Sequence, residues 1–117
     1  MRILLVDDEL ELVTTLAERL VMRGIEAEWA LNGEQALEKI QTTQYEAAVL
    51  DLKMPGMNGL ELIRRMSDIR PDMKYIVLTG HGSEQDDQTC RDAGACFYLT
   101  KPLRIETLIE RLKEAIG

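Results

Sequence analysis

Short apolar runs alternate five times with segments of helical periodicity, and this alternation constrains the fold more than any other feature of the sequence. The first run covers residues 2–6, and the helical segment after it carries apolar residues from Leu10 to Val21, ahead of Gly24. Further strand-like runs lie at residues 27–30, 46–51, 74–80 and 95–101, and the last helix is marked by Leu108, Ile109, Leu112 and Ile116. Because 117 residues leave only short loops, the pattern predicts one doubly wound α/β domain over residues 1–117, with a parallel five-stranded sheet.

Helix boundaries are marked by asparagine and glycine. Asn32 precedes a helical segment with Gln35 three residues later, and Asn58 precedes another with Glu61 at the matching position. A short polar side chain at this place accepts a hydrogen bond from a free backbone N–H of the first turn, so both asparagines are expected N-caps. Gly24 is expected to end the first helix.

Polar residues stand where the expected strands end. Asp7 and Asp8 follow the first strand, Asp51 ends the third, Thr79 the fourth and Lys101 the fifth. The carboxyl ends of parallel strands lie along one edge of a sheet, where such folds bind ligands, so we expect these residues to meet. Three carboxylates and one ammonium sum to −2, which a divalent cation offsets. Oxygen ligands suit Mg²⁺ or Mn²⁺, and without neighbouring His or Cys zinc is disfavoured.

Charge and hydropathy exclude several classes of protein. The formal net charge of −7 lacks the basic footprint of a nucleic-acid-binding domain, so we expect no direct nucleic acid binding. No apolar stretch approaches the roughly 18 residues of a membrane span, and no signal peptide precedes the first strand, so we expect a soluble, cytoplasmic protein without a membrane partner. Cys90 and Cys96 complete neither a zinc site nor a disulfide framework and are expected to be reduced and structural.

Four segments at the strand ends, VDDE, DLKMPGMNG, LTGHG and YLTKP, occur in this order along the chain. Together they resemble the response regulator receiver domains (CheY-like) of two-component signal transduction, and the resemblance covers the whole chain. It implies a flavodoxin-like sandwich with strand order 2-1-3-4-5. It also implies a phosphorylated signalling switch with slow chemistry of its own, rather than a metabolic enzyme.

The resemblance assigns a role to each acid of the expected site. It makes Asp51 the phosphoacceptor, which forms an aspartyl phosphate. Asp8 and Asp51 would ligate Mg²⁺ directly, Asp7 largely through water, and the backbone carbonyl of Lys53 would complete the protein ligands.

Further roles follow from the same resemblance. Thr79 would donate a hydrogen bond to one phosphoryl oxygen, and Lys101 would bind another. Tyr98 matches an aromatic position whose rotamer reports phosphorylation. Pro102 matches a proline usually preceded by a cis peptide, which turns the lysine toward the site. Lys53 and His81, expected in an exposed loop, occupy positions that tune the lifetime of the phosphoryl group.

Taken singly, these residues have simpler interpretations. Asp8 could cap the first helix, because Glu11 stands at the capping-box position. Lys101 could be a solvated lysine at a strand end, Thr79 a strand former at a turn, and Tyr98 a half-buried core aromatic. Capping explains one of three acids, and the coincidence of five such residues favours a functional site.

The resemblance implies that the phosphoryl group comes from the phosphohistidine of a sensor histidine kinase or phosphotransfer protein. An output domain or target protein would bind the face of the fourth helix, fifth strand and fifth helix, and a phosphorylation-dependent homodimer is a further implied assembly. The fourth helix has only Cys90 and Ala93 as apolar anchors, so we expect it to open at low free energy.

The residues bear on three rival functions. A phosphatase of the haloacid dehalogenase type needs a second acid two residues after its nucleophile, where this chain has Lys53. An FMN carrier needs a loop rich in hydroxyls and glycine after the first strand, where this chain has DDELE. A pseudo-receiver that is not phosphorylated and acts as a protein-interaction module remains the alternative.

Overall fold

The computed structural model describes residues 1–80 and 83–117. His81, for which we expected an exposed loop and an influence on phosphoryl lifetime, lies outside the described residues.

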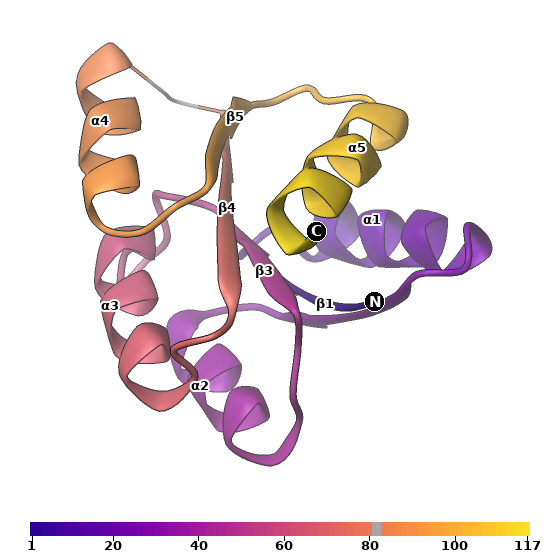
Figure 1. The fold of residues 1–117 in the computed structure, drawn as a ribbon, viewed down its shortest axis with the longest axis horizontal. Coiled ribbons are helices and arrows are strands. Elements are labelled where there is room, and N and C mark those ends of the chain that lie inside the picture. Colours follow the sequence, from indigo (N-terminus) through magenta and orange to yellow (C-terminus); the bar gives the residue numbers. More distant parts are fainter. Residues whose placement is uncertain (81–82) are drawn as a thin grey trace.

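Strands and helices alternate along the described chain as predicted (Figure 1). The elements are β1 (Arg2–Val6), α1 (Leu10–Met22), β2 (Glu26–Ala30), α2 (Gly33–Thr42), β3 (Ala47–Leu50), α3 (Gly59–Ile69), β4 (Lys74–Thr79), α4 (Glu84–Asp92), β5 (Phe97–Thr100) and α5 (Ile105–Ile116). All strand pairs are parallel, and the sheet order is β2-β1-β3-β4-β5. This confirms the doubly wound, flavodoxin-like fold and its predicted strand order.

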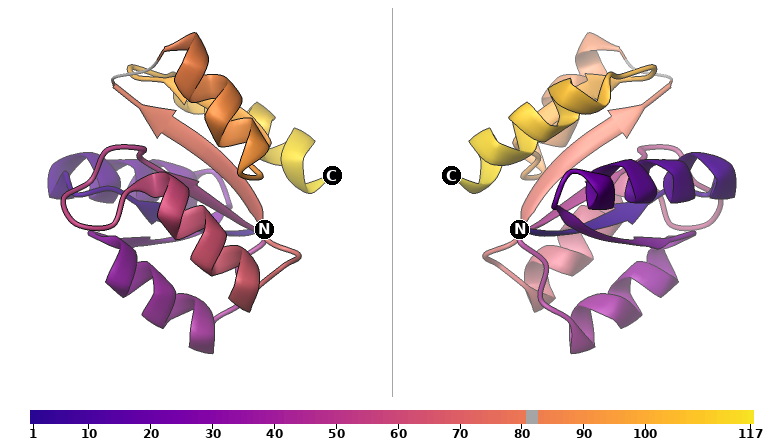
Figure 2. Two further views of the ribbon diagram at one scale, coloured as in Figure 1. Left: turned by 90° about the vertical axis from the view of Figure 1, so that its left-hand side faces the viewer. Right: turned by 90° about the vertical axis from the view of Figure 1, so that its right-hand side faces the viewer.

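Two helical layers cover the sheet. Helices α1 and α5 lie on one face, and α2, α3 and α4 lie on the other (Figures 1 and 2). In β1, Ile3 and Leu5 pack with the first layer, whereas Leu4 and Val6 pack with the second. Because both faces are covered, the central strands need apolar residues at successive positions, and burial of each large side chain contributes about 1.5–3 kcal/mol. The carboxyl edge is therefore the place where polar side chains leave the sheet.

Three strands end one residue before their predicted ends: β4 ends at Thr79 instead of Gly80, and β3 and β5 each end just before a residue of the site. We expected Asp51 within the third strand and Lys101 within the fifth, but β3 ends at Leu50 and β5 at Thr100. Both backbones still follow the sheet for one more hydrogen bond, since the Asp51 N–H donates to Val6 O at 3.0 Å and the Lys101 N–H to Thr79 O at 2.8 Å. Pairing with the neighbouring strand thus still fixes the backbone at both residues, one position beyond the strand ends.

The predicted asparagine caps are confirmed. The Asn32 side chain accepts a hydrogen bond from the Gln35 N–H at 2.8 Å, and the Asn58 side chain accepts one from the Glu61 N–H at 3.0 Å. Each cap satisfies a backbone donor that has no partner inside the helix, which fixes where α2 and α3 begin.

Helix α1 ends as predicted and begins differently from the capping alternative. Gly24 follows its last turn with φ +81° and donates its N–H to Val21 O. At the other end the N-cap residue is Glu9, without a side-chain cap. The interpretation of Asp8 as the cap is therefore wrong, because the helix starts one residue later than that spacing assumed.

The described helices differ in how deeply they pack. Helix α4 buries one side chain, Cys90, while Ala93 just after it is half-buried. Its easy opening stays a prediction. Cys90 and Cys96 are both free thiols, as expected. No helix in the described part of the chain is long and apolar enough to cross a membrane.

Candidate functional site

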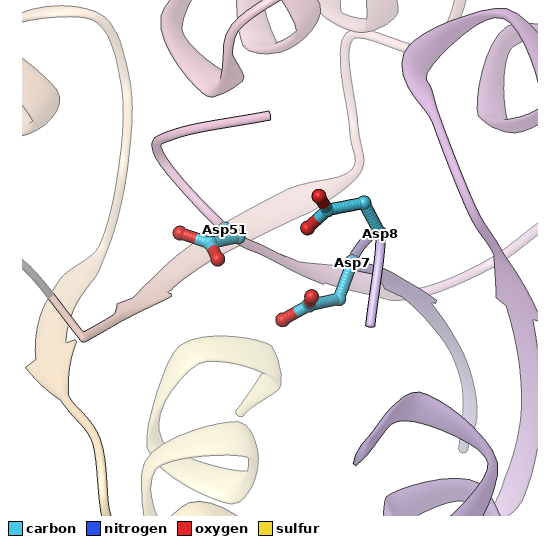
Figure 3. A group of neighbouring side chains, drawn as sticks. All are labelled: Asp7, Asp8 and Asp51. Carbon is cyan, nitrogen blue, oxygen red and sulfur yellow. The ribbon is translucent and has the colours of Figure 1, made fainter. Parts of the chain in front are cut away.

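Three aspartates converge at the carboxyl edge of the sheet. Asp7 and Asp8 follow β1, and Asp51 follows the neighbouring strand β3. Their carboxylates gather in one space in Figure 3, and each contributes an oxygen that lies within 4.8 Å of the others. The structure thus brings together the three acids that the sequence placed at one edge.

The donor set of this acidic pocket fits a divalent cation. All three donors are carboxylate oxygens, which hard cations such as Mg²⁺, Mn²⁺ or Ca²⁺ prefer. Asp7 and Asp51 are each only 7% exposed, whereas Asp8 is exposed and opens the pocket to solvent. Buried acids need a compensating charge, and the open side gives a hydrated cation access.

Lys101 supplies the positive charge that the pocket contains. Its Nζ lies 2.8 Å from Asp7 Oδ2, 3.2 Å from Asp51 Oδ2 and 3.6 Å from Glu9 Oε1. The side chain arrives from the loop after β5, where the Lys101–Pro102 peptide is cis as predicted. One ammonium is therefore shared by three carboxylates, so the pocket keeps a net negative charge.

The protonation equilibria reflect this shared contact. Burial raises the pKa of the Asp7 carboxyl above its ordinary value, and its hydrogen bond from Lys101 opposes burial without cancelling it. Burial also acts most strongly on Lys101, where it lowers the pKa. The hydrogen bonds and charges of Asp7 and Asp51 outweigh burial and raise the pKa of Lys101, so the ammonium stays charged.

Backbone contacts hold Asp51 in place. The Lys53 N–H donates to Asp51 Oδ1 at 3.2 Å, and the Gly59 N–H donates to Leu52 O at 2.9 Å. A Cβ on Gly59 would lie 2.6 Å from the backbone oxygen of Asp51. The start of α3 therefore presses against the backbone of the phosphoacceptor candidate, and only glycine fits there.

Thr79, Tyr98 and Lys53 were also predicted to belong to the site, and their roles there stay predictions. Thr79 ends β4 and is fully buried. The Tyr98 hydroxyl is buried and its ring packs against the core layer of α2, α3 and α4, while burial raises the pKa of the phenol. Lys53 is exposed, and the role of its carbonyl as a ligand stays a prediction.

Sequence reasoning missed two residues of the site. The sequence assigns no role to Glu9 of the VDDE segment, yet its carboxylate lies 3.6 Å from Lys101 Nζ. Gly59 was counted only as part of DLKMPGMNG, yet it sets the approach of α3 to Asp51. For Glu9 the available signal was its position directly after the paired aspartates. For Gly59 it was a glycine at the start of a helix.

Comparisons with known proteins agree with this geometry. The family model for the response regulator receiver domain matches residues 3–113. Response regulator MprA of Mycobacterium avium is 37% identical over 113 residues, which are 97% of this chain and 50% of that protein.

Two solved structures share both fold and sequence with this chain. A CheY-like receiver domain protein from Methanospirillum hungatei has a TM-score of 0.92 and 35% identity, over 98% of this chain and 92% of that one. A response regulator from Burkholderia pseudomallei, solved with a phosphorylated aspartic acid, calcium ion and citrate, has a TM-score of 0.90 and 32% identity, over 95% of this chain and 65% of that one.

The chain spans about half the length of the curated relatives it matches, such as MprA. The part they share is the part that contains the sheet and the acidic pocket. With its family match, strand order and aspartate cluster, this chain belongs to the response regulator receiver domains of two-component systems, which are signalling switches rather than catalytic enzymes.

Proposed function

We propose that Asp51 accepts a phosphoryl group from the phosphohistidine of a sensor histidine kinase or a phosphotransfer protein, in a Mg²⁺-dependent reaction. The observation that carries this proposal is the position of the Asp51 carboxylate, which lies 3.2 Å from the Lys101 ammonium and has an oxygen within 4.8 Å of those of Asp7 and Asp8. The phosphorylated aspartic acid of the related Burkholderia protein supports it.

The transfer needs no further reactant. An oxygen of Asp51 forms a bond to phosphorus while the bond from phosphorus to the donor's imidazole nitrogen breaks, and that nitrogen keeps the electron pair. A carboxylate nucleophile requires no general base, so the reaction depends on positioning and charge neutralisation. Lys101 would bind one phosphoryl oxygen, and Thr79 would donate a hydrogen bond to another.

The cation site is part of the same proposal. Asp8 and Asp51 would ligate Mg²⁺ directly, Asp7 would act largely through water, and the backbone carbonyl of Lys53 would be the remaining protein ligand. When bound, the cation supplies positive charge that offsets the repulsion between a phosphate donor and a carboxylate nucleophile.

The output of the switch is proposed to be a change in a protein surface. Thr79 would move toward the phosphoryl group and Tyr98 would follow it, which alters the face made by α4, β5 and α5. An output domain, a target protein or a second copy would bind that face. We further propose that residues 1–117 act as one receiver unit, in the cytoplasm with the kinase.

Labelling with a small donor tests the proposal. Acetyl phosphate with Mg²⁺ should add one phosphoryl group to the chain, as seen by intact-mass measurement, and EDTA should stop the reaction. The product should be an acyl phosphate, so hydroxylamine should remove it, whereas a phosphoserine or phosphothreonine would survive.

Variants locate the label. Asp51→Asn should abolish labelling because an amide is a poor nucleophile, and Thr79→Ala should still label. Asp68→Asn, the same change on an exposed residue of α3, is the matched control and should label normally. Labelling without Mg²⁺, or undiminished labelling of the Asp51→Asn protein, would contradict the proposal. No labelling of the unmodified chain would favour the pseudo-receiver, an interaction module that works without phosphate.

A further inference from the structure

Glu9 contacts the site without having any of the roles proposed above. Its Oε1 lies 3.6 Å from Lys101 Nζ, which is already paired with Asp7 and Asp51. Its backbone N–H donates to Asp7 Oδ1 at 2.9 Å. Glu9 is thus joined to the site twice, through its backbone to a buried acid and through its side chain to the lysine.

The same residue is poorly suited to its place in the helix. Glu9 is the N-cap of α1, with extended backbone angles, and its side chain makes no cap hydrogen bond. Serine, threonine, aspartate and asparagine are preferred at this position because a short side chain reaches the free N–H groups of the first turn. A local preference that is not met tends to mark a functional site. Here the glutamate reaches away from the helix, to Lys101.

We propose that Glu9 is a positioning residue for Lys101. By sharing the ammonium with Asp7 and Asp51, Glu9 holds it among the acids of the unphosphorylated site and opposes its transfer to a phosphoryl group on Asp51. The inference rests on the proposed function of Asp51 as phosphoacceptor.

Two opposite effects follow from this contact. The negative charge of Glu9 adds to the field that attracts a divalent cation to the neighbouring aspartates. Glu9 therefore favours Mg²⁺ binding. The same charge repels a phosphoryl group and competes with it for Lys101, so Glu9 disfavours the phosphorylated state.

The size of each effect is set by exposure. The Glu9 side chain is 65% exposed, so solvent screens its pair with Lys101. Exposed ion pairs of this kind change an equilibrium by about 1.5- to fivefold. Both effects should shrink as the salt concentration rises.

The test uses the whole chain and two equilibrium constants. Calorimetry gives the dissociation constant for Mg²⁺, and a titration at saturating Mg²⁺ gives that for beryllofluoride, a mimic of the phosphoryl group. Glu9→Gln should weaken Mg²⁺ binding and tighten beryllofluoride binding, each by about 1.5- to fivefold. A folding defect would weaken both, so the opposite signs separate a positioning role from a structural one.

Two further variants sharpen the comparison. Glu9→Ser removes the charge and supplies an N-cap, so it should shift both constants as Glu9→Gln does while raising the melting temperature. Glu11→Gln removes the same charge from an exposed position in the first turn of α1 and should leave both constants nearly unchanged.

The outcomes separate this inference from the function on which it rests. If the unmodified chain binds beryllofluoride but Glu9→Gln shifts neither constant, or shifts both in one direction, the role of Glu9 is overturned alone. If Glu11→Gln shifts both dissociation constants as much as Glu9→Gln does, the effect comes from net charge alone, and the proposed role of Glu9 is also overturned. If the unmodified chain neither binds beryllofluoride nor takes a label, the proposed function fails and this inference fails with it.

Discussion

Replacing Asp8 by asparagine isolates the electrostatic cost of the acidic pocket. Asp8 contributes a carboxylate oxygen within 4.8 Å of those of Asp7 and Asp51, and Lys101 donates hydrogen bonds to these two partners. No cation pairs with Asp8 within residues 1–80 and 83–117. Asn has nearly the same shape, so the change removes one charge and little else.

The magnitude follows from the spacing of the charges. Two unit charges 4.8 Å apart repel by about 0.9 kcal/mol at the dielectric constant of water and by about 3.5 kcal/mol at an effective value of 20. The lower figure applies because Asp8 is exposed. Asp8 is repelled by two acids, and the attraction of Lys101 offsets about one of these terms. We expect Asp8→Asn to gain about 1 kcal/mol of stability without Mg²⁺, or about 4 °C in melting temperature.

Mg²⁺ should reverse which of the two proteins, Asp8→Asn or the unmodified chain, is the more stable. A cation at 100 times its dissociation constant stabilises the protein it binds by about 2.7 kcal/mol. The variant has lost a proposed ligand and should gain much less. Urea unfolding followed by circular dichroism should therefore show Asp8→Asn as the more stable protein in EDTA and the unmodified chain as the more stable one in Mg²⁺.

A clear loss of stability for Asp8→Asn in EDTA would refute the argument, because it would mean that the Asp8 carboxylate stabilises the metal-free fold. Capping cannot produce such a loss, since Glu9 is the N-cap of α1 and asparagine is itself a good cap. Asp68→Asn serves as the control, and this exposed substitution should change stability by less than about 0.5 kcal/mol in either buffer.

Three other outcomes are expected. Gly59→Ala should cost about 1–3 kcal/mol in urea unfolding and slow labelling, because its Cβ would lie 2.6 Å from the backbone oxygen of Asp51; unchanged stability would mean that the loop yields freely. Asn58→Ala should lower the stability by about 1 kcal/mol in thermal melts through the lost cap of α3, while Asn58→Asp should retain it. Helix α4, which buries only Cys90, should exchange its amide hydrogens faster than α1, and equal protection would contradict its weak anchoring.

The fold was predictable because its signals are local and repeated. Each strand is an apolar run, and β3 is buried at all its positions, as a central parallel strand requires. Asn32 and Asn58 identified helix starts through spacings of three residues, and the structure contains both hydrogen bonds. The strand ends predicted at Asp51 and Lys101 are each one residue too far, because the backbone N–H of both residues still pairs with the neighbouring strand after the regular strand has ended.

The site was predictable only where topology forces residues together. Parallel strands bring Asp7, Asp51 and Lys101 to one edge whatever the loops do, and the lysine reaches an acid 94 residues earlier in the chain. Spacing pointed to Asp8 as the cap of α1, because Glu11 follows it at the capping-box position, whereas glutamate is not a preferred cap. The observed start at Glu9 goes with two contacts to the site: its side chain lies 3.6 Å from Lys101, and Asp7 accepts its N–H. The start of α1 and the charge distribution of the pocket therefore involve the same residue, Glu9. The VDDE segment alone does not predict this, because the contact to Lys101 comes from a distant part of the chain.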